Sequence, residues 1–253
     1  MMVAVALLFG VLLGLLISLV GGGGSIVTVP VLVYLLGEDI HTATTTSLVI
    51  VGLTSLAGAI PYTRTGRVAV PTALLFGASG IGGAFIGTAL NARVSGELLL
   101  LLFGVLMLVT ALRMAFIRVS TIAPAKTSAW RKRMATTGIG FIVGIMTGFF
   151  GVGGGFLIVP TLVLLLRFPM SIAVGTSLII ISINSLAGIV AHAGSATIDV
   201  RVALLITSGG LAGTMLGSTA ARYVNDVQLA RGFAAMVALM GVFLIAQNGI
   251  SIV

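Results

Sequence analysis

Long apolar runs dominate this sequence and constrain its fold more than any other feature. Most of them reach the roughly 20 residues that an α-helix needs to cross about 30 Å of hydrocarbon. Hydrophobic residues make up 58% of the 253 residues and charged residues 7%, whereas a typical soluble domain has about 25% charged residues. The sequence therefore predicts an all-α integral membrane protein. The apolar runs are residues 2–20, 42–60, 68–90, 98–117, 139–150, 172–193, 200–221 and 229–246.

The second half of the sequence repeats the first. Residues 14–90 align without a gap to residues 144–220, at a constant offset of 130 and with 26 identities in 77 positions. Duplicated halves of a membrane protein commonly meet at a transport site built from interrupted helices. We predict two homologous transmembrane segments, residues 1–117 and 135–253, joined by a basic linker over residues 118–134.

The charge bias of the loops predicts their sidedness. Basic residues concentrate on the cytoplasmic side of membrane proteins, so the linker and the loop around residues 64–67 are expected inside and the acidic loop 37–39 outside. With residues 2–36 as one pass broken at its glycines, each half has about four helices, both termini are cytoplasmic and the repeats are parallel. This arrangement is favoured.

A second arrangement stays open, because one helix over residues 2–36 would be about 52 Å long, well beyond the bilayer thickness. The glycine run must therefore redirect the chain. If the short run 25–36 returns as a separate pass or a re-entrant hairpin, each half contains an odd number of crossings. The repeats would then be inverted, as in many transporters.

Two glycine clusters are the strongest candidates for a functional site. Several glycines together break a helix, and unpaired backbone is tolerated in a membrane only where it is buried in protein or lines a wet cavity. A short apolar run follows each cluster, so free N–H groups and the positive end of a helix would face that cavity and bind an anion. The alternative is that the glycines only permit a kink. The candidate residues are Gly21, Gly22, Gly23, Gly24, Ser25, Gly151, Gly153, Gly154 and Gly155.

Polar residues in the following helices are the second set of candidates. Thr46, Ser47, Thr176, Ser177 and Asn184 could supply neutral hydrogen-bond donors for an oxyanion. Helical spacing places Ser177 and Asn184, seven residues apart, on one face. The alternative for each hydroxyl is an interhelical hydrogen bond, worth about 0.6 kcal/mol on average.

Other glycines are interpreted as helix-packing sites. Gly83 and Gly87, and likewise Gly213 and Gly217, are four residues apart, which lets helix backbones approach closely in lipid. Further glycines of this kind are Gly10, Gly14, Gly140, Gly144 and Gly148.

Ionisable residues are informative mainly through their positions. All five acidic residues fall in predicted loops or at segment ends, so the sequence predicts no intramembrane carboxylate as a proton relay. His41 and His192 lie near segment ends and are candidates for proton coupling. The chain has no cysteine, and we predict no cofactor or metal. The net charge of +8 is assigned to membrane topology and not to nucleic-acid binding.

One enzymatic motif provides an alternative hypothesis. Gly77-Ala78-Ser79-Gly80 matches the G-x-S-G pattern of rhomboid intramembrane serine proteases, with His192 as the base that such a mechanism requires. Against this, the internal repeat aligns Ser79 with Gly209, and His192 lies beside a loop.

The glycine-rich run in the second half carries a family resemblance. Residues 148–156 read Gly-Phe-Phe-Gly-Val-Gly-Gly-Gly-Phe, and Pro160 and Gly175-Thr176-Ser177 follow. This pattern resembles the TauE/SafE family, and the similarity covers nearly the whole chain. The resemblance implies a bacterial or archaeal cytoplasmic-membrane transporter of sulfur-containing anions such as sulfite, sulfoacetate or other organosulfonates, with export often proposed.

These observations combine into one functional hypothesis. The two glycine breaks face each other across the repeat interface and hold an oxyanion between helix N-termini, while one half rocks against the other to give alternating access. An anion channel that uses the same site is the nearest alternative. The expected partners are a small anion and the lipid bilayer; a homodimer is compatible with the sequence, and nucleic acid is not expected.

Overall fold

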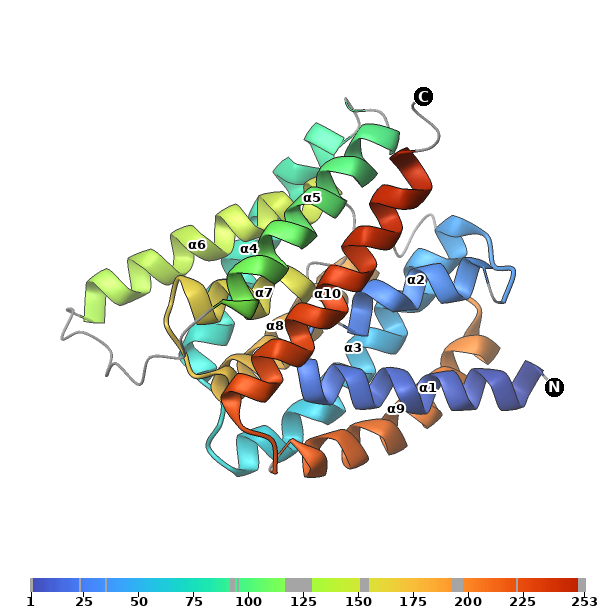
Figure 1. The fold of residues 1–253 in the computed structure, drawn as a ribbon, viewed down its shortest axis with the longest axis horizontal. Coiled ribbons are helices and arrows are strands. Elements are labelled where there is room, and N and C mark those ends of the chain that lie inside the picture. Colours follow the sequence, from blue (N-terminus) through green and yellow to red (C-terminus); the bar gives the residue numbers. More distant parts are fainter. Residues whose placement is uncertain are drawn as a thin grey trace.

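The chain forms only helices in the part that the structure describes. The computed structural model describes residues 2–22, 24–34, 36–91, 94, 96–116, 129–150, 155–192, 198–221 and 223–249. Among these described residues, seven helices are long and apolar enough to cross a membrane, and these are α1, α3, α4, α6, α8, α9 and α10. The all-helical, multi-pass architecture is therefore confirmed (Figure 1). The helices are α1 (Met2–Val20), α2 (Gly24–Tyr34), α3 (Ile40–Arg64), α4 (Val70–Asn91), α5 (Gly96–Ala115), α6 (Ala129–Phe150), α7 (Gly155–Leu164), α8 (Met170–His192), α9 (Val200–Ala220) and α10 (Asp226–Gly249).

Polar caps at the loops set where the last two helices begin. Asp199 is the N-cap of α9, and its carboxylate accepts the N–H of Val202 at 2.9 Å. Asn225 and Gln228 form a capping box at the start of α10, in which each side chain accepts the backbone N–H of the other residue, at 2.8 and 3.2 Å. Between such caps the apolar segments remain helical because lipid offers no partner for a free backbone group.

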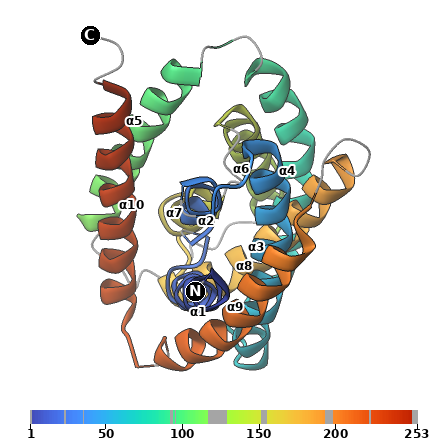
Figure 2. The same cartoon turned by 90° about the vertical axis from the view of Figure 1, so that its right-hand side faces the viewer.

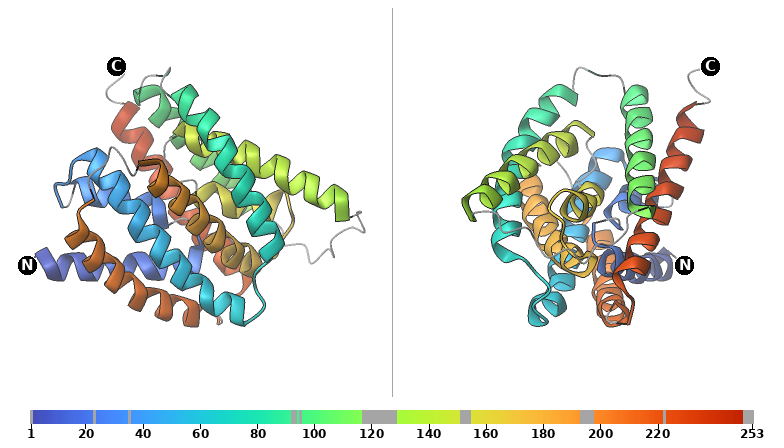
Figure 3. Two further views of the ribbon diagram at one scale, coloured as in Figure 1. Left: turned by 180° about the vertical axis from the view of Figure 1, so that it is seen from behind. Right: turned by 60° about the vertical axis from the view of Figure 1, so that its left-hand side comes forward.

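The first five and last five helices are interleaved. α1 packs against α9, α4 against α6, α3 against α8 and α5 against α10, so each of these pairs joins one helix from each half of the chain. Seen from the right of Figure 1, the short helices α2 and α7 lie in the middle, between α5 and α10 on one side and α3, α4, α6 and α9 on the other (Figure 2). Seen from behind, α9 lies beside α3, and α4 lies beside α6 (Figure 3).

Glycines bring two of these pairs into backbone contact. A methyl group on Gly10 of α1 would overlap the carbonyl oxygen of Ile206 of α9, and one on Gly14 would overlap that of Gly210. Residue numbers rise together along both helices, so α1 and α9 run parallel. α4 and α6 are parallel by the same argument, and the glycines interpreted as packing sites do lie at these contacts. The corresponding contacts join Gly83 to Phe141 and Gly87 to Ile145.

The other two pairs run antiparallel. A methyl group on Gly52 of α3 would lie 2.9 Å from Cβ of Ser185 of α8, whereas one on Gly58 would lie 3.5 Å from Leu178. Residue numbers therefore fall along α8 as they rise along α3. The helix starts also match at the offset of the sequence repeat, because α3, α4 and α5 begin 130 residues before α8, α9 and α10.

The favoured interpretation of residues 2–36 as one broken pass is wrong. The glycine run separates α1 from α2, and α2 leads back to the end of the molecule where α1 begins (Figure 1). Glu38, which follows α2, lies beside Asp199 at the start of α9, and α9 runs parallel to α1. Each half of the chain therefore contains five helices when the short helices α2 and α7 are included, and α1 and α6 run in opposite directions.

The expected position of the termini is corrected in the same way. The first residues of α1 and the last residues of α10 lie at one end of the molecule, whereas α6 begins at the opposite end (Figure 1). The loop between α3 and α4 also lies at that opposite end, because the N–H of Ala69 donates to Thr176 near the start of α8. The termini and the start of α6 were expected on one side because α1 and α2 were counted as a single crossing.

Candidate functional site

The first glycine break meets the start of α7 inside the protein. Gly21 ends α1 in a left-handed conformation, with φ of 75°, and its N–H donates to the carbonyl of Ile17 at 2.8 Å. The next residue, Gly22, lies so close to Gly155 that a methyl group on Gly22 would overlap the backbone of Gly155. Both residues are buried. The end of the first break therefore touches the start of α7 backbone to backbone, a contact that only glycines permit.

The N-termini of α2 and α7 both lie at this contact. α2 leads toward the end where α1 begins, and α7 leads toward the opposite end, where the N–H of Ser171 donates to Asp226 at 3.0 Å. The two helices therefore place their positive ends together, each equivalent to about half an elementary charge. The first-turn N–H groups of a helix have no partner within the helix, and such groups can bind an anion.

Acidic side chains are remote from the glycine contact in the part of the chain that the structure describes. Glu38 and Asp39 lie in the loop before α3, while Asp199 and Asp226 lie at the starts of α9 and α10. Burial, and then the neighbouring carboxylate of Asp199, raise the pKa of Glu38 above its ordinary value. The negative charge thus gathers at helix ends, and the buried glycine contact keeps a positive potential.

Ser177 is brought to the site, but its hydroxyl proton is already committed. A methyl group on Gly21 would lie 2.7 Å from Oγ of Ser177, which is fully buried. The Ser177 hydroxyl donates to the carbonyl of Val174 at 2.8 Å, and Ser47 makes the equivalent bond to Thr44 at 2.7 Å. In this conformation Ser177 therefore offers lone pairs to the site, and it must rotate before it can donate to an anion.

Thr46 and Thr176 accept hydrogen bonds from the backbone just before two helices. Oγ1 of Thr46 accepts the N–H of Asp199 at 3.2 Å, and Oγ1 of Thr176 accepts the N–H of Ala69 at 3.0 Å. Ala69 and Asp199 directly precede α4 and α9, so each threonine fixes the start of a helix against α3 or α8. These contacts place the two threonines in the helix framework and not at the glycine contact.

Asn184 lies where α8 meets α4. Its Oδ1 is buried without a hydrogen-bond partner and lies 4.0 Å from the position that a Cβ of Gly80 would take. Asn184 follows Ser177 by two helical turns, a rise of about 10 Å along α8. Asn184 and Ser177 share a face of α8, but Asn184 lies two turns further from the glycine contact than Ser177 does.

The remaining candidates lie partly outside the described residues. Gly24 and Ser25, predicted within the glycine cluster, lie in the first turn of α2. Nothing is described of the side chains of Ser25, His41 and His192. Gly23, Gly151, Gly153 and Gly154 lie outside the described residues altogether.

An aromatic cluster beside the second break was not predicted. The ring of Phe103 on α5 lies 5.4 Å from that of Phe150 and 5.0 Å from that of Phe156, measured between centroids. Phe150 ends α6, and Phe156 is the second residue of α7. One feature of the sequence could have indicated it, because Phe233 follows Phe103 by the repeat offset of 130 residues.

Comparisons with known proteins agree with this architecture. A family model described as "Sulfite exporter TauE/SafE" matches residues 6–244. A "Probable membrane transporter protein" of Xylella fastidiosa (strain 9a5c) is 34% identical over 250 residues, which cover 96% of this chain and 95% of the relative. "Probable membrane transporter protein YunE" of Bacillus subtilis is 28% identical over 266 residues, covering 96% and 97%. No solved structure matches the chain.

Proposed function

The chain belongs to the TauE/SafE family of membrane transporters, and on that premise we propose that it carries small sulfur-containing anions such as sulfite, sulfoacetate or related organosulfonates. The observation that carries the proposal is the buried contact between Gly22 and Gly155, at which the N-termini of α2 and α7 meet. Backbone N–H groups there bind the anion, and the rotated hydroxyl of Ser177 adds a further donor.

Family membership makes the chain a transporter and not an enzyme, which removes the protease alternative. The structure shows another role for Ser79, the serine of the G-x-S-G pattern. The hydroxyl of Ser79 donates to the carbonyl of Phe76 at 3.1 Å, and Oγ lies against Gly140 of α6. Ser79 thus packs in the contact between α4 and α6.

The interleaved helices change the expected mechanism of alternating access. Rocking one half of the chain against the other would separate α1 from α9 and α4 from α6, the pairs held by glycine backbone contacts. The bodies that can move as units are instead α1, α2, α3 and α9 on one side and α4, α6, α7 and α8 on the other. The antiparallel pair α3 and α8 joins them, and the glycine contact lies between them. In transporters with inverted repeats, the two repeats commonly give two equivalent groups of helices that move against each other around a central site.

Charge supports one orientation in the cytoplasmic membrane. The end at which α6, α8 and α10 begin carries a large excess of basic residues over Asp226, whereas the described residues of the opposite end carry Glu38, Asp39 and Asp199 against Arg201. Basic loops favour the cytoplasm, so the start of α6 is inside and both termini are outside. The described basic residues at the inner end are Arg64, Arg67, Arg113, Arg131, Lys132, Arg133, Arg167 and Arg231.

Anion flux into proteoliposomes tests the function. Purified protein is assayed with sulfite, sulfoacetate, sulfate and chloride, beside the variant Gly22→Ala, whose added methyl would overlap Gly155. The control is Gly232→Ala on α10, where a methyl meets nothing within 4 Å. We expect saturable flux of a sulfur oxyanion that Gly22→Ala abolishes and Gly232→Ala retains. No flux with folded wild-type protein overturns the proposal, and non-saturating flux favours a channel.

A further inference from the structure

Phe103 of α5 contacts both sides of the second glycine break. Its ring meets Phe150 at a tilt of 43° and Phe156 at 89°, an edge-to-face arrangement that aromatic pairs favour. Phe150 is the last residue of α6 and Phe156 lies in the first turn of α7. The ring of Phe103 therefore contacts the end of α6 and the start of α7 at once. Phe103 and Phe156 are almost fully buried, with 3% and 1% of their surfaces exposed.

The placement of α5 makes this contact informative. α5 packs mainly against α10 at the edge of the molecule and makes only small contacts with α6 and α7 (Figure 2). Met107, one turn after Phe103, is equally buried but faces α10, where it contacts Gly241. α5 therefore packs against α10 and also directs one aromatic side chain, that of Phe103, at the end of α6 and the start of α7.

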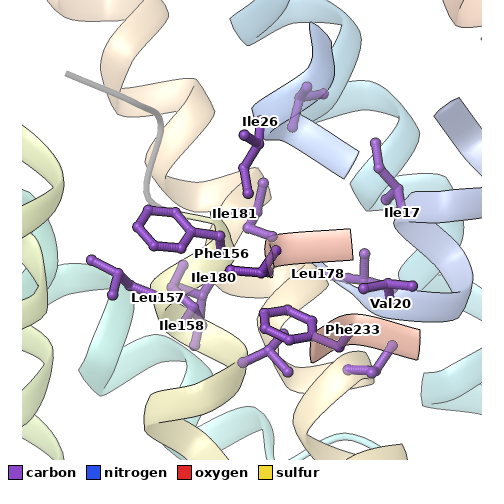
Figure 4. Close-up of a cluster of buried hydrophobic side chains, with 14 of the residues drawn as sticks. Ile17, Val20, Ile26, Phe156, Leu157, Ile158, Leu178, Ile180, Ile181 and Phe233 are labelled. Atoms are coloured by element: carbon purple, nitrogen blue, oxygen red, sulfur yellow. The ribbon is translucent and has the colours of Figure 1, made fainter. Parts of the chain in front are cut away.

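The first break has an equivalent residue on α10. Phe233, fully buried, belongs to the same cluster as Val20, the last residue of α1, and Leu178 of α8 (Figure 4). α10 contacts both of those helices.

We propose that Phe103 is a positioning residue, which holds the first turn of α7 in place against the end of α6 and so keeps the anion-binding N–H groups aligned. The part that concerns anion binding rests on the proposed function, whereas the ordering of α7 does not. A bound anion needs donors fixed in position, since displacement by about 1 Å is enough to weaken a preorganised site strongly.

The test compares Phe103→Ala with Met107→Ala, which removes a similarly buried side chain from the same helix. Amide hydrogen exchange is measured over residues 155–158, and flux is measured against sulfite concentration. We expect Phe103→Ala to speed exchange at these amides and to raise the half-saturation concentration about tenfold, with maximal flux changed far less. Met107→Ala should leave the amide exchange rates of residues 155–158 and the half-saturation concentration unchanged relative to wild type.

Two further variants keep the outcome decisive if Phe103→Ala folds poorly. Phe103→Leu keeps the apolar volume but loses the ring contacts, and should give a smaller change of the same kind. Phe103→Ala combined with Phe156→Ala should be no worse than Phe103→Ala alone, because the second ring acts through the first. Equal exchange in Phe103→Ala and Met107→Ala, or a double variant clearly worse than Phe103→Ala alone, overturns the proposal. If wild-type protein carries no sulfur anion, the proposed function fails while the exchange result still decides the ordering of α7.

Discussion

Gly21 satisfies two constraints that no other residue can meet together. Its left-handed backbone is unfavourable for a residue with a Cβ, and a methyl there would lie 2.7 Å from Oγ of Ser177 and 2.8 Å from Cγ2 of Val159. Gly37 has a similar φ of 72° but meets nothing within 4 Å. Comparing alanine substitutions at the two glycines therefore separates the free-energy cost of a left-handed backbone from the free-energy cost of overpacking.

We expect Gly21→Ala to lower the free energy of unfolding by about 3 kcal/mol, the sum of a backbone cost near 1 and an overpacking cost near 2. Gly37→Ala should cost only about 1 kcal/mol, because it carries the backbone term alone. Denaturant titration of both variants in the same detergent measures the difference. Equal losses would show that Gly21 is not confined by α7 and α8.

A pH-dependent stability is expected from Glu38, whose pKa is raised by burial and by Asp199. A carboxyl with a raised pKa in the folded state binds its proton more tightly there, so stability is greatest below the ordinary pKa of 4.5 and falls as the pH rises through the folded pKa. Glu38→Gln should raise the thermal midpoint at pH 7 and leave it unchanged below pH 4.5. The neighbouring variant Asp39→Asn is the control, and a gain from Glu38→Gln that does not vary with pH would contradict the assignment.

Helix pairs, at the next scale, depend on how closely their backbones approach. A methyl on Gly213 of α9 would overlap the carbonyl of Val11 on α1, with Leu15 also in contact. We expect Gly213→Ala to lower the free energy of unfolding by about 1 to 3 kcal/mol. Gly138→Ala on α6, where a methyl meets nothing, should be neutral or slightly stabilising because alanine favours the helix. The same denaturant titration measures both, and a neutral Gly213→Ala would mean that α1 and α9 can move apart freely.

Sequence patterns predicted the elements better than their partners. The apolar runs and glycine clusters located the helices and both breaks, because length and glycine content act locally. The reversal of the chain at Gly21 was the open alternative and not the favoured arrangement. The attachment of Thr46 to Asp199 was missed, because it depends on residues far away in the sequence. Ser177 lies beside Gly21, and its role as a donor to an anion stays a prediction. The commitment of its hydroxyl to Val174 was not predicted.

At the scale of the whole molecule, the charge distribution predicts which end faces the cytoplasm. The chain has no cysteine, so single cysteines can be introduced without background labelling. Gly37 and Gly66 form a matched pair, since both lie in open loops with positive φ and meet nothing within 4 Å. We expect a membrane-impermeant maleimide to label Gly37→Cys and Val3→Cys in intact cells, and Gly66→Cys only after permeabilisation. If Val3→Cys and Gly66→Cys are instead labelled under the same condition, residues 3 and 66 lie on one side of the membrane. That result would support the arrangement in which residues 2–36 make a single pass.

Interleaving also predicts that neither half is stable alone. A chain divided within residues 117–128 should yield two fragments that are degraded when expressed singly, because α1 lacks α9 and α6 lacks α4. Coexpressed fragments should accumulate and purify together, which quantitative immunoblotting measures. Stable accumulation of residues 1–122 alone would contradict this.

The pairing of α1 with α9 has a consequence for biosynthesis. Leu7 and Gly209, which touch in the folded protein, are 202 residues apart in the chain. At about 5 to 20 residues per second, the ribosome reaches α9 roughly 10 to 40 s after it has completed α1. Throughout that interval the glycine face of the first helix is in the membrane without its partner. The cell must therefore protect an inserted but unassembled helix from proteolysis until almost the whole chain has been translated.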